Sequence, residues 1–82
     1  MLFRSQVTNG TAIINYNENM GERRCPISLD DFTPNEQICQ IRGCNHIFKT
    51  EPLMRWFESH IECPVCRYDL TQYRQPVASN IP

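Results

Sequence analysis

The sequence predicts a small α+β domain with a short β-hairpin, one central helix and long ordered loops, stabilised by a bound metal ion. The chain has 82 residues, and so short a chain buries only about 60% of its unfolded surface. Ordering each residue costs about 1.5 kcal/mol of conformational entropy, and the sum exceeds the free energy that burial of so small a core supplies. The chain contains five cysteines, and an odd number without a signal peptide argues against a secreted disulfide framework. A metal site in a reducing compartment is therefore expected.

Composition divides the chain into three parts. Residues 1–24 have no sustained period and are predicted to form a flexible N-terminal arm, in which residues 11–16 are a candidate strand that docks on the domain. Cysteine, proline and aromatic residues concentrate between residues 25 and 70, the predicted domain. Residues 71–82 are rich in Gln, Asn, Ser and Pro and are predicted to form a flexible C-terminal tail.

The hairpin is predicted from two apolar pairs on either side of a short turn. Ile38 and Ile41 precede residues 42–46, and Ile47 and Phe48 follow them. Short apolar runs around a turn that contains glycine indicate two paired strands.

The helix is predicted from its start signals and its spacing. Thr50 is a plausible N-cap, Glu51 suits the positive helix end, and proline is tolerated in a first turn. Apolar and aromatic residues then recur at helical steps, at Leu53, Trp56, Phe57 and His60. We expect the helix to end near residues 61–64, because Pro64 disfavours helix at the residue before it.

Charge and hydropathy narrow the range of partners and compartments. The net charge is −1, with one lysine against seven arginines and no basic patch, so nucleic acid is not expected as a partner. There is no run of about 18 apolar residues, so no membrane-spanning helix is expected. The first ten residues lack the apolar segment of a signal peptide. The expected location is intracellular, either cytoplasmic or nuclear.

Two short motifs supply a complete set of zinc ligands. Cys63 and Cys66 form a Cys-x-x-Cys knuckle, and Cys44 and His46 form a Cys-x-His pair. Three sulfurs and one nitrogen suit a tetrahedral structural zinc, whose closed site leaves no position for a catalytic water. Such binding contributes on the order of 10–16 kcal/mol. The alternative, a redox Cys-x-x-Cys with buried thiols, is disfavoured because no thioredoxin-like pattern surrounds the knuckle.

Residues 25–70 resemble the RING finger domains of ubiquitin ligases, which hold two zinc ions at eight positions in a cross-brace. The eight positions fall on Cys25, Ser28, Cys44, His46, Lys49, Pro52, Cys63 and Cys66. The gaps between them are 2, 15, 1, 2, 2, 10 and 2 residues, which is similar to the subclass with two histidines. Seven matching gaps are far more specific than one Cys-x-x-Cys.

The resemblance implies one structural zinc rather than two. Positions three, four, seven and eight hold the second zinc of the family, and all four residues are present here. Positions one, two, five and six hold the first zinc, and only Cys25 among them ligates well. Losses confined to one site predict a folded variant with one zinc. We expect Lys49 to replace part of the lost site by bonding to the opposing loop, at Ser28, Asp30 or Asp31.

Two further residues are potential ligands. Cys39 lies in the strand pattern and is expected to be a small buried hydrophobic residue. His60 lies three residues before Cys63 and competes with His46 for the metal. The family spacing favours His46, which leaves His60 as a polar or packing residue at the helix end.

The resemblance implies a ubiquitin ligase domain that binds a ubiquitin-conjugating enzyme and promotes transfer of ubiquitin to a substrate protein. RING domains act by proximity, without a covalent intermediate. Ile27, Trp56 and Pro64 match the residues that contact the conjugating enzyme, with Trp56 as the central anchor. Arg67 matches the basic residue that bridges the enzyme and ubiquitin, and is the candidate catalytic residue. The plainer alternatives are core packing for Trp56 and a solvated surface position for Arg67.

Two other functions stay open at this point. The Cys-Pro-Ile-Ser string and the single retained zinc site are also similar to the RING-like domains of SUMO ligases, whereas Arg67 argues against a SUMO ligase. A catalytically inactive module that only binds protein is the second alternative, since the loss of one zinc site can accompany the loss of ligase activity. The sequence does not indicate the substrate.

Overall fold

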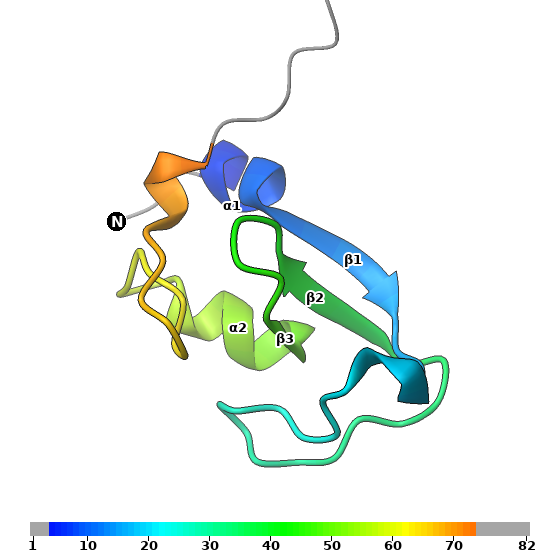
Figure 1. The fold of residues 1–82 in the computed structure, drawn as a ribbon. Coiled ribbons are helices and arrows are strands. Elements are labelled where there is room, and N and C mark those ends of the chain that lie inside the picture. Colours follow the sequence, from blue (N-terminus) through cyan, green and yellow to red (C-terminus); the bar gives the residue numbers. More distant parts are fainter. Residues whose placement is uncertain (1–3, 74–82) are drawn as a thin grey trace, which may run out of the picture.

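A three-stranded antiparallel sheet with one main helix against it forms the centre of the computed structural model, which describes residues 4–73 (Figure 1). The strands are β1 (Thr11–Asn15), β2 (Gln37–Ile41) and β3 (Ile47–Lys49), in the order β1-β2-β3. The helices are α1 (Arg4–Gly10) and α2 (Thr50–Trp56), with short 3-10 helices η1 (Glu18–Met20) and η2 (Leu70–Gln72). This arrangement confirms the predicted α+β class.

The predicted hairpin is β2–β3, and the third strand comes from the predicted arm. Strand β1 pairs with β2 from Thr11 opposite Ile41 to Asn15 opposite Gln37. How the chain divides into arm, domain and tail stays a prediction, and residues 74–82 of the tail lie outside the described residues.

Helix α1 has no counterpart among the predicted elements. Its sequence contains Val, Thr, Asn and Gly, which are weak helix formers, and it has no periodic apolar stripe. It is held by tertiary contacts with β1 and η2, and by the hydroxyl of Thr11, which donates to the carbonyl of Val7 at 2.6 Å.

Helix α2 differs from its predicted start and end. Lys49 rather than Thr50 occupies the N-cap, and it makes no side-chain cap bond. The helix ends at Trp56, because the amides of Glu58 and Ser59 donate to carbonyls three residues back, at 3.1 and 3.2 Å. Such bonds tighten a last turn into 3-10 geometry. The apolar spacing predicted a longer helix because the turns after Trp56 still place side chains at nearly helical intervals.

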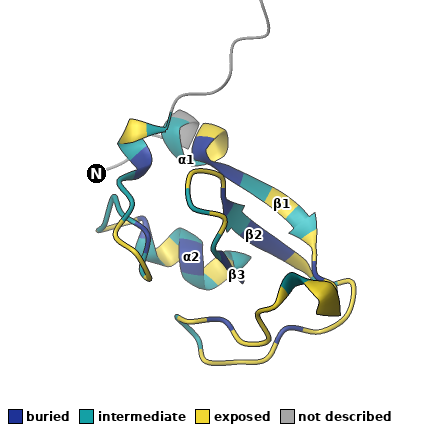
Figure 2. Cartoon of the chain, in the orientation of Figure 1, coloured by how far each residue is buried: buried dark blue, intermediate teal, exposed yellow. Residues whose placement is uncertain are grey.

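The core lies between the sheet and α2, and Figure 2 shows its buried positions in β2 and α2. Fully buried side chains include Ile38, Ile41, Phe48, Leu53 and Leu70. Cys39 is 0% exposed, which confirms its expected role as a small buried hydrophobic residue. No helix within residues 4–73 is long and apolar enough to cross a membrane.

Candidate functional site

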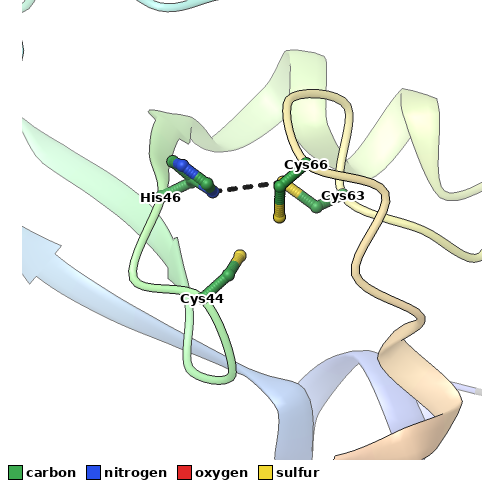
Figure 3. Close-up of side chains that lie close together, drawn as sticks. All are labelled: Cys44, His46, Cys63 and Cys66. Carbon is green, nitrogen blue, oxygen red and sulfur yellow. Dashed lines mark hydrogen bonds between the residues drawn. The ribbon is translucent and has the colours of Figure 1, made fainter.

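Four side chains from two separate loops converge on one point, as Figure 3 shows. Cys44 and His46 lie in the β2–β3 turn, and Cys63 and Cys66 lie in the loop between α2 and η2. Their ligand atoms all lie within 4.8 Å of one another. Cys63 Sγ is 3.5 Å from His46 Nδ1.

The Cys63–Cys66 loop is shaped by backbone hydrogen bonds around Cys63. The amide of Cys63 donates to the carbonyl of Tyr68 at 2.8 Å, and the amide of Arg67 donates back to the carbonyl of Cys63 at 2.9 Å. Arg67 has a φ of 64°, in the left-handed region. A non-glycine residue there is uncommon, so the loop constrains the backbone directly after Cys66.

The donor set fits a zinc ion. Burial, together with the neighbouring Cys66 and Cys63 thiols, raises the pKa of the Cys44 thiol to about 12. A second thiolate this close to a first one is disfavoured because the two charges repel, and a divalent cation relieves that repulsion. Three thiolates and one imidazole are typical of a tetrahedral structural zinc site. The Cys/His cluster therefore suggests zinc binding.

The first loop repeats the backbone of the Cys63–Cys66 loop at Cys25. The amide of Cys25 donates to the carbonyl of Asp30, and the amide of Leu29 donates back to the carbonyl of Cys25, both at 2.9 Å. Leu29 has a φ of 62°, and Ser28 stands where Cys66 stands in the other loop. The flanking bridges Arg24–Asp31 and Glu62–Asp69 also correspond. The first loop thus keeps the form of a zinc knuckle while one of its two thiols is replaced by a hydroxyl.

The residues at the other family positions make contacts of a different kind. Cys25 Sγ accepts a hydrogen bond from the amide of Lys49 at 3.3 Å. Burial opposes ionisation of Cys25, but hydrogen bonds from Ser28 and Lys49 outweigh it and lower the pKa of this thiol. Pro52 offers no ligand atom. Cys25, Ser28, Lys49 and Pro52 therefore do not fit the family's first zinc site.

Lys49 does brace this region, but through a partner that the sequence analysis missed. Its Nζ lies 2.8 Å from Glu36 Oε2, in a pair whose side chains are 21% and 24% exposed. The expected bond to Ser28, Asp30 or Asp31 is wrong. Glu36 Oε1 also accepts from the amide of Thr33 at 2.9 Å. The Lys49 hydrogen bond and then the Thr33 amide hold the pKa of Glu36 below its usual value.

A groove of about 440 Å³ lies between the first loop and one flank of α2. Ile27 and Ser28 line it from the loop, and the rest of its lining comes from α2 and the turn that follows it: Glu51, Pro52, Arg55, Trp56, Ser59 and His60. Ile27 and Trp56, both predicted as partner contacts, thus share one surface. Pro64 is half-buried in the second loop and Arg67 is exposed, and neither is among the lining residues.

Trp56 and His60 form a stacked pair that the sequence analysis did not foresee. Their ring centroids are 3.7 Å apart and their planes differ by 6°. The four-residue spacing of two aromatic side chains at the helix end was the available signal. His46 rather than His60 lies in the cysteine cluster.

Comparisons with known proteins agree with this geometry. The family model described as "Ring finger domain" matches residues 23–67. The chain is 41% identical over 58 residues to the human E3 ubiquitin-protein ligase RNF126, covering 71% of this chain and 18% of that protein. It is 36% identical over 52 residues to E3 ubiquitin-protein ligase ATL6 of Arabidopsis thaliana, covering 63% and 13%. It is 33% identical over 58 residues to the Arabidopsis RING-H2 finger protein ATL33, covering 71% and 25%. The chain belongs to the RING finger family and spans a quarter or less of each of these relatives.

Proposed function

We propose that this chain is a RING-type ubiquitin ligase domain that binds a ubiquitin-conjugating enzyme and promotes ubiquitin transfer to a substrate protein. The observation that carries the proposal is the groove in which Ile27 of the first loop and Trp56 of α2 meet. An apolar residue beside a large aromatic anchor is typical of a binding hot spot. Membership of the RING finger family, whose members compared above include proteins named E3 ubiquitin-protein ligases, supports the same function.

One structural zinc is part of the proposal. Cys44, His46, Cys63 and Cys66 would hold it, and the bound ion would join the β2–β3 turn to the loop that carries Pro64 and Arg67. Such an ion supplies folding free energy and no reacting group, since all four ligands come from the protein.

The first zinc site is replaced, in this proposal, by contacts within the chain. The Cys25 loop is closed by its own backbone hydrogen bonds, and the Lys49–Glu36 pair ties the start of α2 to the segment before β2. These contacts would keep Ile27 in position without a metal ion.

Catalysis would consist of holding the loaded enzyme in a reactive arrangement. Ile27, Trp56 and Pro64 would bind the conjugating enzyme. Arg67 is exposed, and its backbone is held at the end of the second loop. Its planar guanidinium can donate to carbonyl groups of the enzyme and of ubiquitin at the same time. This pair of contacts would form only in the reactive arrangement, so it would raise the rate of transfer more than the affinity for the enzyme.

Discharge of ubiquitin from a loaded conjugating enzyme onto free lysine tests the proposal. The zinc-loaded chain should accelerate discharge with at least one enzyme of a broad panel, and Trp56→Ala should abolish the acceleration. The same discharge assay with a SUMO-loaded conjugating enzyme, run in parallel, tests the alternative modifier. Stimulation of SUMO transfer alone, or binding without stimulation of either transfer, would refute the proposed activity.

A further inference from the structure

We infer that His60 positions Trp56 in the groove and thereby determines which part of the indole a partner can contact. The inference rests on the proposed function for its partner, and on the stacked pair for its geometry. His60 belongs to neither the cysteine cluster nor the buried core. Its ring instead covers one face of the Trp56 indole, with the centroids 3.7 Å apart.

Trp56 is restrained by two further contacts. Its Nε1 donates to the carbonyl of Glu62 at 2.7 Å. The Nδ1 atom of His60 lies 3.2 Å from the carbonyl oxygen of Trp56 and 3.1 Å from the hydroxyl of Ser59. The imidazole is thus anchored to the backbone of the residue on which it stacks. Ring and backbone contacts together hold the indole in one orientation.

A carbonyl oxygen only accepts, so Nδ1 of His60 is the donor in its contact with the Trp56 carbonyl. This bond ties the imidazole to the helix end and keeps it over the indole.

The charged side chains that line the groove pair with each other, since Glu51 and Arg55 of α2 lie 3.2 Å apart. Glu62 Oε1, beside the groove, accepts from the amide of Ile61 at 3.0 Å. The first loop contributes Ile27 and Ser28 to the lining, and both are uncharged.

Because one indole face is taken by His60, a partner reaches Trp56 only through the rest of its surface and through Ile27. Removal of the imidazole would free the indole to turn and would open the groove on that side. His60 is therefore expected to affect partner affinity without touching the zinc ligands.

Tryptophan fluorescence tests the stack directly, because Trp56 is the only tryptophan of the chain. At one fixed pH, acrylamide should quench the emission of zinc-loaded His60→Ala more strongly than that of the wild type, because removal of the imidazole uncovers one face of the indole. Quenching of His60→Phe and of Glu58→Gln, a control at an exposed position outside the groove lining, should match that of the wild type. Equal quenching of the wild type and of folded, zinc-loaded His60→Ala overturns the inference.

Affinity for a conjugating enzyme tests the consequence. An aromatic pair is worth roughly 0.5–1.5 kcal/mol, so His60→Ala should weaken binding about two- to tenfold. His60→Phe, which restores a stacked ring, should return it to within about twofold of wild type. Unchanged affinity in a folded, zinc-loaded His60→Ala overturns the positioning role. If no enzyme binds the wild type, the proposed function fails, and the fluorescence quenching experiment still decides whether His60 covers Trp56.

Discussion

Replacement of Lys49 by methionine should destabilise the domain although Lys49 is neither a member of the cysteine cluster nor one of the buried core residues. The substitution keeps the length of the side chain and removes the ammonium that lies 2.8 Å from Glu36 Oε2. Glu36 retains the amide and hydroxyl of Thr33 on its other oxygen. The backbone bond from Lys49 to Cys25 Sγ does not depend on the side chain.

The expected loss follows from the burial of the pair. Exposed ion pairs contribute about 0–1 kcal/mol, and hydrogen bonds to charged groups contribute about 1.5–3 kcal/mol when water is excluded. With side chains 21% and 24% exposed, the pair lies between these cases. We expect a loss of about 1–2 kcal/mol, which lowers the Tm of a domain this size by about 5–15 °C.

Thermal unfolding in saturating zinc measures the loss, and a double-mutant cycle with Glu36→Gln isolates the pair from other effects. The Arg55–Glu51 pair is the matched control, because its side chains are 75% and 80% exposed at a distance of 3.2 Å. Glu51→Gln should therefore cost little. If Lys49→Met unfolds like the wild type, or the coupling energy is no larger than that of the control pair, the Lys49–Glu36 pair does not replace the first zinc.

Three other predictions follow from the groove, the second loop and the pKa of Glu36. Trp56→Ala should weaken binding of a conjugating enzyme by roughly 2 kcal/mol or more in calorimetry while zinc stays bound; loss of folding would instead assign Trp56 to the core. Arg67→Ala should slow lysine discharge and leave the affinity for unloaded enzyme nearly unchanged, so equal discharge rates would exclude the bridging role. The pKa of Glu36 is lowered from 4.5, chiefly by the Lys49 hydrogen bond, so the stability it contributes is complete above that pH and is lost as the pH falls below it. The difference in stability between wild type and Glu36→Gln should therefore stay constant from pH 8 to 5.5 and shrink below about 4.5. A difference that grows as the pH falls would contradict the sign.

The parts of the fold that could be predicted are those with local signals. Turn residues flanked by apolar pairs indicated the β2–β3 hairpin, and apolar spacing indicated α2. The zinc cluster could be predicted because two ligand pairs have fixed short spacings within the family pattern. The structure places all four ligand atoms together, although they come from segments on either side of α2.

What could not be predicted depends on contacts between distant segments. Helix α1 is held by tertiary contacts and has no local signal of its own. Lys49 is paired with Glu36, which lies directly before β2. Nothing in the residue spacing favours Glu36 over Asp30 and Asp31 of the first loop. The left-handed backbone of Leu29 could not be predicted either, because it arises from the hydrogen bonds that close the first loop.

The number of zinc ions per chain tests the account most directly. Native mass spectrometry of the wild type should show one zinc, and the ion should be absent from the Cys63→Ser, Cys66→Ser double variant. Cys25→Ser should retain it, because Cys25 lies in the loop that is closed by hydrogen bonds. A wild-type mass with two zinc ions, or a zinc that survives in the double variant, would contradict the proposal that contacts within the chain replace the first site.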